Sequence, residues 1–259
     1  MSRYSYVSII QNLVSLGFVV VSIDSPNSGL MLLPNGEMIS TLYEVDPVIH
    51  SESMAKDVSF VYDYIKDSKD KRLREISRYV DLKKAGVVGH SLGGAAAFES
   101  CRIDDRFSAC INLDGDPFGV VETVGLNKPS LIILNEPTFP PERFSKPGSK
   151  ERWDSMGNIR KKTWQNLFAK SKHVPVSAIR IMGTNHMSFT DFPFIALQYY
   201  RNRNAGIIIN RERGLTIITS YIKAFFDRYL LNNGSVDMNK LSGLFPECNI
   251  YLTTEKKND

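Results

Sequence analysis

The chain has 259 residues, of which 42% are apolar and 23% charged, the composition of one large globular domain or two small ones. Its 32 Lys and Arg exceed its 28 Asp and Glu by four. No basic run is concentrated enough to make nucleic acid an expected partner. No apolar stretch approaches the roughly 20 residues of a membrane-spanning helix, and the first residues lack a secretory signal pattern. The three cysteines, Cys101, Cys110 and Cys248, lack CxxC spacing and predict neither a disulfide scaffold nor a zinc site.

Short apolar runs rich in Val and Ile predict the strands of the fold. Continuous apolarity indicates burial on both faces, as in parallel strands between layers of helices. The predicted strands are Phe18–Asp24, Gly86–Gly89, Ala109–Asp114, Ser130–Asn135 and Ser177–Met182. We therefore expect an α/β fold with a mostly parallel sheet covered by helices on both faces.

Helical periodicity fills the intervals between these strands. Apolar residues of Tyr6–Val14 share one face before the first strand, and Val58, Tyr62 and Ile65 do so before the second. A strong amphipathic helix is predicted over Leu215–Leu231. We expect one domain over residues 1–231 and a polar, frayed tail over residues 232–259.

Two segments interrupt the alternation of strands and helices. Pro26–Pro47 mixes Asn, Gly and Pro with apolar residues. It is predicted to be a loop that passes over the carboxyl ends of the strands, the loop end of the sheet. Glu136–Met156 contains four prolines and is predicted to be a loop that borders a site.

The sharpest motif is Gly89-His90-Ser91-Leu92-Gly93, which leaves a predicted strand and enters an Ala-rich helix. This G-x-S-x-G context is typical of a nucleophile elbow, a tight turn that holds the serine hydroxyl above the sheet. The amino end of the helix favours the negative charge of an oxyanion. We expect Ser91 to be a nucleophile and the backbone N–H of Leu92 to be an oxyanion donor.

A serine nucleophile needs a histidine base, and the chain has four histidines. His90 belongs to the elbow and is expected to point away from the reacting face of the serine. His50 and His173 are interpreted as surface or capping residues. His186 follows the last predicted strand at the loop end of the sheet, where parallel sheets form their sites, and is the predicted base.

Carboxylates at the ends of two strands are candidates for the acid that orients this base. Asp114 ends one predicted strand, and Glu136 follows the next. Most α/β-hydrolases take the acid from the later strand. Asp116 is a weaker candidate, because Gly115 and Pro117 suggest a turn toward solvent. The residues alone leave Asp114 and Glu136 as alternatives.

Three stretches resemble the plasma-type (isoform II) platelet-activating factor acetylhydrolases. They are Gly-His-Ser91-Leu-Gly-Gly-Ala, the run Asp105–Asp114, and His186-Met-Ser-Phe-Thr-Asp-Phe. Tyr4-Ser-Tyr and Leu16-Gly-Phe-Val-Val also resemble the first helix and next strand of that family. The resemblance extends to about Leu231 and implies an α/β-hydrolase fold with Asp114, rather than Glu136, as the acid.

The family hydrolyses short or oxidised acyl chains from phospholipids without calcium. The resemblance thus implies a serine esterase or lipase with the triad Ser91, His186 and Asp114, and with no metal or organic cofactor. The expected partner is an ester or phospholipid substrate. Contact with a lipid surface, the oligomeric state and the localisation are left open.

This sequence departs from the family at two places. The family carries a large aromatic residue where this chain has Asp116, which predicts a more polar acyl pocket. The family also has a strand and a His-Gly loop before the helix that here begins near Tyr4, and that loop supplies the second oxyanion amide. We therefore expect an N-terminally shortened form, or an incomplete gene model, of a longer esterase. One buried strand and one oxyanion donor are then missing, and losing the donor would lower turnover by about 100-fold to 1000-fold.

Two other functions share the elbow. A cutinase-like polyester hydrolase or general carboxylesterase would take its acid from Glu136. A non-catalytic binding protein of the same fold would keep the triad residues without turnover.

Overall fold

A five-stranded sheet forms the centre of the structure. The computed structural model describes residues 2–26, 29–33, 35–41, 46–136, 149–195 and 209–254. The strands are β3 (Ala85–His90), β4 (Phe107–Leu113), β5 (Ser130–Asn135), β6 (Val176–Ile181) and β7 (Cys248–Thr253), in the spatial order β3-β4-β5-β6-β7. The strands β3 to β6 run parallel, and β7 pairs antiparallel with β6. The predicted strands at 86–89, 109–114, 130–135 and 177–182 are thereby confirmed.

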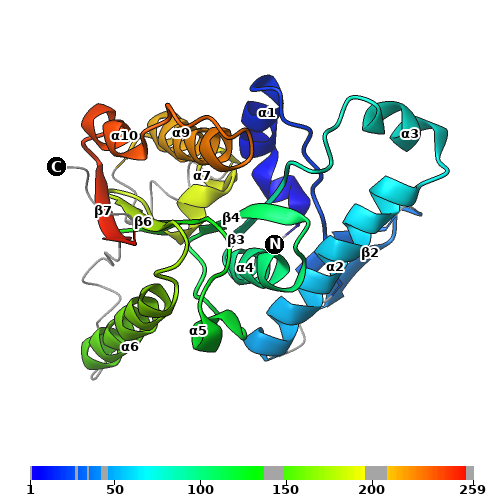
Figure 1. Cartoon of the computed structure of the whole chain (residues 1–259). Helices are drawn as coiled ribbons and strands as arrows, with labels where there is room; N and C mark the ends of the chain where they lie inside the picture. The colour runs from blue at the N-terminus through cyan, green and yellow to red at the C-terminus, as the bar shows by residue number, and fades with distance from the viewer. Residues whose placement is uncertain are drawn as a thin grey trace.

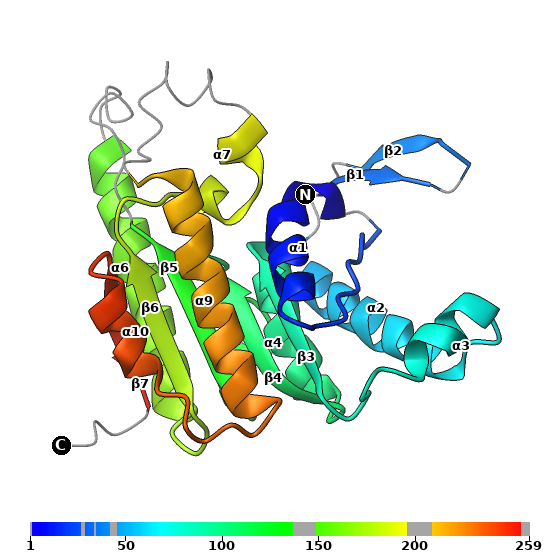
Figure 2. The same ribbon diagram turned by 90° about the horizontal axis from the view of Figure 1, so that it is seen from above.

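Helices cover both faces of this sheet (Figures 1 and 2). One face carries α1 (Val7–Ser15), α9 (Arg211–Tyr229) and α10 (Met238–Leu244). The other carries α2 (Pro47–Asp67), α4 (Leu92–Ile103) and α6 (Ser149–Lys170). Short helices join these elements: η1 (Arg3–Tyr6), α3 (Lys71–Ser77), α5 (Val121–Val124), η3 (His186–Phe189) and α7 (Phe192–Ile195). The expected α/β architecture is confirmed.

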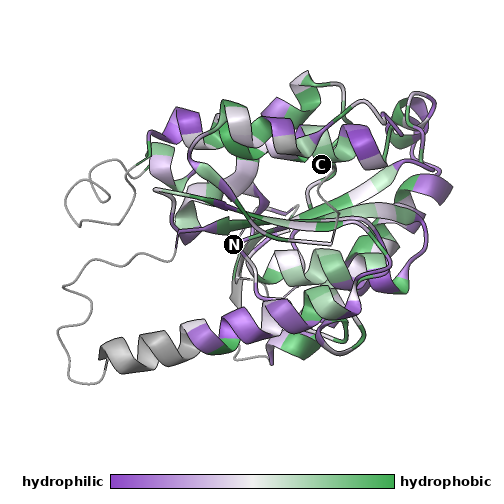
Figure 3. Ribbon diagram, turned by 60° about the vertical axis from the view of Figure 1, so that its left-hand side comes forward, coloured by the Kyte–Doolittle hydropathy of each residue, from purple (hydrophilic) through white to green (hydrophobic). Residues whose placement is uncertain are grey.

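Neighbouring residues of one strand pack into different cores. Ile111 lies in the core beneath α1 and α9, whereas Cys110 lies in the core beneath α4 and α6. Both side chains are fully buried. Figure 3 shows the sheet between its two helical layers, with apolar residues along the strands. Burial from both faces is why these strands are apolar at successive positions.

The predicted strand at Phe18–Asp24 is wrong. This segment has no regular secondary structure and pairs with no strand among the described residues. Phe18 and Val20 pack against the core, whereas Val19 and Val21 are 56% and 51% exposed. Asp24 instead accepts a hydrogen bond from the backbone N–H of Arg3 and forms an ion pair with its guanidinium. An apolar run becomes a strand only where a neighbour takes up its backbone groups.

The two irregular segments also contain more structure than expected. Within Pro26–Pro47 lies an antiparallel pair of strands, β1 (Gly29–Leu32) and β2 (Met38–Thr41). The carboxylate of Asp46 then caps the start of α2. In the predicted loop Glu136–Met156, the helix α6 begins at Ser149, and residues 137–148 lie outside the described residues.

The tail after Asn232 is not frayed over its described length. It contains α10 and the edge strand β7, whose Cys248 is buried. Residues 255–259 lie outside the described part of the chain. No helix in the described ranges combines the length and apolarity that a membrane span requires.

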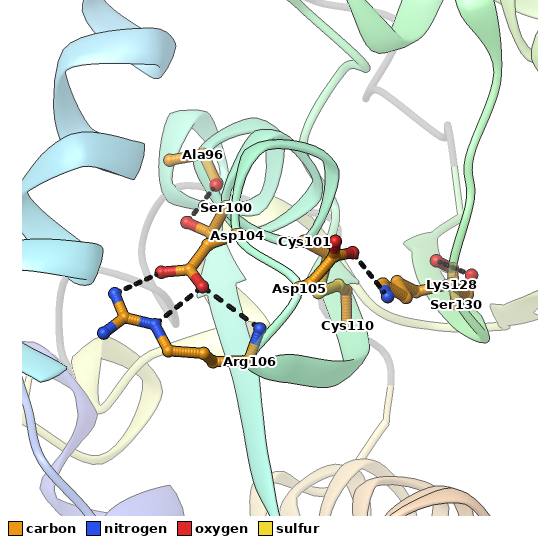
Figure 4. Close-up of a disulfide and its surroundings, with 9 residues drawn as sticks. All are labelled: Ala96, Ser100, Cys101, Asp104, Asp105, Arg106, Cys110, Lys128 and Ser130. Carbon is orange, nitrogen blue, oxygen red and sulfur yellow. Dashed lines mark hydrogen bonds and ion pairs between the residues drawn. A yellow bond between two sulfur atoms is a disulfide. The ribbon is translucent and has the colours of Figure 1, made fainter. Parts of the chain in front are cut away.

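A disulfide joins Cys101 near the end of α4 to Cys110 in β4, with the Cα atoms 6.5 Å apart (Figure 4). The sequence predicted no disulfide scaffold, because an odd cysteine count without paired spacing gave no signal for this bridge. The two cysteines meet because α4 packs back onto the strand that follows it. Cys248 is buried and unpaired.

Candidate active site

The turn between β3 and α4 has the geometry of a nucleophile elbow. Ser91 lies between the two elements with φ 57° and ψ −126°, in a region that L-residues rarely adopt. A Cβ on Gly89 would lie 1.9 Å from the carbonyl oxygen of Gly93. The motif therefore needs a glycine at that position, because the strand and helix approach closely there. Leu92 is the first residue of α4, so its backbone N–H belongs to the helical turn that has no intrahelical acceptor.

The loop after β4 packs directly against this elbow. The backbone N–H of Ser91 donates to the carbonyl of Leu113 at 2.9 Å. A Cβ on Gly115 would lie 2.0 Å from the carbonyl oxygen of Ser91. The side chain of Asn112 accepts a hydrogen bond from the N–H of Gly115 at 2.7 Å and holds the turn. Asp114 is thus fixed beside Ser91 through its neighbours in the chain.

Asp114 and His186 are brought together. Oδ2 of Asp114 lies 2.6 Å from Nδ1 of His186, and Oδ1 accepts a hydrogen bond from the N–H of Asn135 at 3.0 Å. The Asp114 side chain is 1% exposed, whereas that of His186 is 43% exposed. Asp114 has φ 54° and turns its carboxylate toward the segment after β6 that carries His186, which we call the histidine loop. With Nδ1 bound to a carboxylate, the imidazole keeps Nε2 as its accepting nitrogen.

The other two candidate carboxylates have different partners. Oε2 of Glu136 accepts a hydrogen bond from the backbone N–H of Gly183 at 2.6 Å. Glu136 therefore supports the loop that leads from β6 to His186. Asp116 forms an ion pair with Nε of Arg160 on α6.

A capped 3-10 helix presents His186 at the end of β6. The side chain of Asn185 accepts a hydrogen bond from the N–H of Met187 at 3.0 Å and forms a capping box with Ser188. Phe189, the last residue of this helix, is fully buried. Asp191 accepts hydrogen bonds from the N–H of Ser8 at 3.2 and 3.3 Å, in the first turn of α1. The histidine loop is thus attached to α1 through Asp191.

His90 lies beside His186. Its Nε2 lies 2.9 Å from the carbonyl oxygen of His186, its Nδ1 lies 3.0 Å from the hydroxyl of Tyr6, and the two imidazole centroids are 4.5 Å apart. A carbonyl only accepts, so Nε2 of His90 carries the proton and the Tyr6 hydroxyl donates to Nδ1. Burial lowers the pKa of His90 to about 3, so this ring is neutral at physiological pH.

The remaining histidines belong to other segments of the chain. His50 is 9% exposed in the first turn of α2, so its interpretation as a surface residue is wrong. His173 is exposed before β6. Within the described ranges, no group of three or more His, Cys, Asp or Glu side chains is placed to hold a metal ion.

Arg160 lies close to Asp114, and no sequence motif predicts this contact. Nη2 of Arg160 lies 3.5 Å from the carbonyl oxygen of Asp114 and 3.7 Å from its Oδ1. Arg160 also pairs with Asp116. A single arginine on a charged helix carries no motif, and its role depends on how α6 docks.

The parallel sheet, the elbow at Ser91 and the Asp114–His186 pair define an α/β-hydrolase. In agreement, the solved structure of a ferulic acid esterase from Streptomyces cinnamoneus matches with a TM-score of 0.73 and 28% identity, covering 97% of this chain and 71% of that chain. The family described as platelet-activating factor acetylhydrolase, isoform II, matches residues 56–233, which include all three residues. The chain belongs to this family.

Two relatives extend the comparison over more of the chain. A protein of Arthroderma benhamiae named "Probable 1-alkyl-2-acetylglycerophosphocholine esterase" is 24% identical over 262 residues, covering 95% of this chain and 62% of that protein. The platelet-activating factor acetylhydrolase of Canis lupus familiaris is 25% identical over 211 residues, covering 77% of this chain and 40% of that protein. The chain spans less than two thirds of the length of either relative.

Proposed function

We propose that this chain is a carboxylic ester hydrolase with Ser91 as nucleophile, His186 as general base and Asp114 as the carboxylate that orients the base. The observation that carries the proposal is the 2.6 Å contact between Asp114 Oδ2 and His186 Nδ1 beside an elbow serine. Membership of the acetylhydrolase family supports the same reaction class.

The proposed reaction proceeds by acyl transfer in two steps. Nε2 of His186 takes the proton of Ser91 Oγ as that oxygen attacks the ester carbonyl. The tetrahedral intermediate collapses, and the imidazolium returns its proton to the leaving alcohol. Water, deprotonated by the same imidazole, then attacks the acyl carbonyl. The bond between the acyl carbon and Oγ breaks, the imidazolium returns its proton to Oγ, and the carboxylic acid leaves. Asp114 stabilises the imidazolium in both steps without accepting its proton.

The N–H of Leu92 is the proposed donor to the oxyanion. It is the first amide of α4, and the amino end of a helix favours negative charge. The protein's own groups perform every step of this mechanism, so it uses no metal or organic cofactor.

The proposed substrates are phospholipid-like esters with a short acyl chain, of the 1-alkyl-2-acetylglycerophosphocholine type. The names of both relatives support this class. The ion pair of Asp116 and Arg160 lies where the family carries a large aromatic residue, which favours a more polar acyl pocket.

A second candidate substrate class is the esters of aromatic acids. It is favoured by the likeness to the ferulic acid esterase, which covers 97% of this chain. Both candidates use the same triad, and their acyl groups differ: a short acyl chain in the first and an aromatic acyl group in the second.

Labelling with a fluorophosphonate tests the catalytic proposal. We expect one covalent adduct on Ser91, detected by mass spectrometry of the labelled peptide, and none in a Ser91→Ala variant. Folding of both proteins is checked by circular dichroism. A folded protein that takes up no label would support a non-catalytic binding protein instead.

A substrate series then separates the acyl classes. The enzyme is assayed on p-nitrophenyl esters of increasing chain length, on methyl ferulate and on a phospholipid with a short second acyl chain. We expect kcat/KM to fall as the acyl chain lengthens and to be highest for the short-chain phospholipid. A preference for methyl ferulate would replace the phospholipid class by the aromatic one.

A further inference from the structure

Arg160 connects two carboxylates of the loop after β4. Its Nε pairs with Asp116, and its Nη2 lies 3.7 Å from Oδ1 and 3.5 Å from the carbonyl oxygen of Asp114. The side chains of Arg160 and Asp116 are 35% and 40% exposed, whereas that of Asp114 is 1% exposed. One guanidinium thus approaches a buried carboxylate and a partly exposed one.

The Asp114 carboxylate lies between this guanidinium and the imidazole of His186. Oδ2 contacts Nδ1 of His186 at 2.6 Å, and Oδ1 faces Arg160. Stabilisation of imidazolium by Asp114 is therefore opposed by the positive charge on the far side of the carboxylate. The negative charge of Asp116 offsets that positive charge.

These two charges act on the protonation of His186 in opposite directions. A unit charge several ångströms away, in surroundings partly open to water, changes such an equilibrium by about half a pH unit to one unit. Arg160 disfavours imidazolium, and Asp116 favours it.

We propose that Asp116 and Arg160 form a balanced charge pair, in which each charge offsets the displacement that the other alone would cause in the pH range where His186 is a neutral base. Both are positioning residues that act through Asp114 and do not contact the reacting atoms. The inference rests on the proposed function only in treating His186 as the base. It predicts that altering either charge displaces the acid limb of activity, each in its own direction.

Other titratable groups around His186 remain the same in each comparison. His90 is neutral above its pKa of about 3 and binds the His186 carbonyl and Tyr6. Glu136 accepts a hydrogen bond from the N–H of Gly183, and Asp191 accepts one from the N–H of Ser8 at the start of α1. Their contributions cancel when a variant is compared with the wild-type protein.

Nuclear magnetic resonance of the histidine rings tests the pair without catalysis. The chain has four histidines, and the His186 signal is assigned from its loss in His186→Gln. We expect the titration midpoint of His186 to rise by about half a unit or more in Arg160→Gln and to fall by a similar amount in Asp116→Asn. Arg160→Lys keeps the charge and is expected to stay near wild type.

Activity supplies the second measurement. For p-nitrophenyl acetate, the acid limb of the kcat/KM profile is expected to move to higher pH in Arg160→Gln and to lower pH in Asp116→Asn. The double variant removes both charges, so its displacement should be smaller than that of either single variant. If the ring midpoints move in this way while the folded wild-type protein hydrolyses no ester, the charge pair holds and the proposed function fails.

Lys128 and Asp105 provide the matched control. They form an ion pair at 2.9 Å beside the amino ends of β4 and β5, at the opposite end of the strands from the site (Figure 4). Lys128→Gln and Asp105→Asn change the net charge by the same amounts as the site variants. We expect neither control variant to shift the His186 midpoint or the acid limb of the kcat/KM profile.

Three results would overturn the inference. A shift of the His186 midpoint in the same direction in both site variants would indicate a loss of structure rather than of charge. Equal displacement in the control variants would indicate a general effect of net charge. Unchanged midpoints in folded site variants, verified by thermal unfolding, would show that the guanidinium is not coupled to His186.

Discussion

Asp114, Asp116 and Glu136 all follow strands at the same end of the sheet, yet each binds a different partner. Asp114 contacts His186, Asp116 pairs with Arg160, and Glu136 holds the N–H of Gly183. Sequence position alone could not separate the first from the third. The difference arises from the left-handed backbone of Asp114, with φ 54°, and from a hydrogen bond that commits Glu136 to the histidine loop.

Replacing the two carboxylates separately tests these assignments. Asp114→Asn leaves a side chain that no longer stabilises imidazolium, so kcat should fall by about 10⁴-fold. Glu136→Gln keeps an oxygen that accepts from Gly183, so kcat should fall by less than about tenfold. Both are measured on p-nitrophenyl acetate with folding checked by circular dichroism. The reverse order of effects would transfer the acid role to Glu136, as in the cutinase-like alternative.

The contacts of His90 could not be predicted from its position in the sequence. Its place within the elbow motif gave no sign that its ring would bind the carbonyl of His186 and the hydroxyl of Tyr6. These partners lie 96 and 84 residues away. A contact of this kind depends on the docking of η1 and η3, which no local pattern records.

At the scale of elements, hydrophobic runs predicted strands well where the sheet supplied neighbours. The runs that form β3 to β6 are hydrogen-bonded to one another as neighbouring parallel strands. The expected alternation of strands and helices between them is confirmed. Phe18–Asp24 has a similar composition but no described partner. The edge strand β7 is not predicted, because the overall polarity of the tail conceals the apolar Ile250-Tyr251-Leu252.

The disulfide between α4 and β4 should stabilise the pair of elements that carries Ser91 and Asp114. A bridge that closes a short loop typically contributes about 2–3 kcal/mol. Full reduction, verified by thiol counting, should therefore lower the free energy of unfolding in urea by about that amount. A Cys101→Ala/Cys110→Ala variant should show no such response to reductant. Equal stability of the oxidised and reduced proteins would indicate that the bridge adds nothing.

At the scale of the whole molecule, the histidine loop joins the N-terminal segment of the chain to the elbow. Asp191 binds the start of α1, and the hydroxyl of Tyr6 binds His90, which in turn holds His186. The sequence showed the chemistry of each motif separately. Their assembly depends on the packing of α1 and α9 over the sheet, so the buried His90 links the site to the stability of the fold.

The stability of the molecule should therefore depend on pH through His90. Its pKa is lowered to about 3 by burial, whereas an unfolded histidine titrates near 6.5. Between these values the unfolded chain binds the extra proton. The free energy of unfolding should fall by up to about 1.4 kcal/mol per unit as the pH decreases from 6.5 toward 3. Urea denaturation at pH 6.5, 5.5 and 4.5 measures this slope. His90→Phe should be less stable at pH 6.5 but show a shallower slope, because its ring does not titrate, and equal slopes would contradict the role of His90.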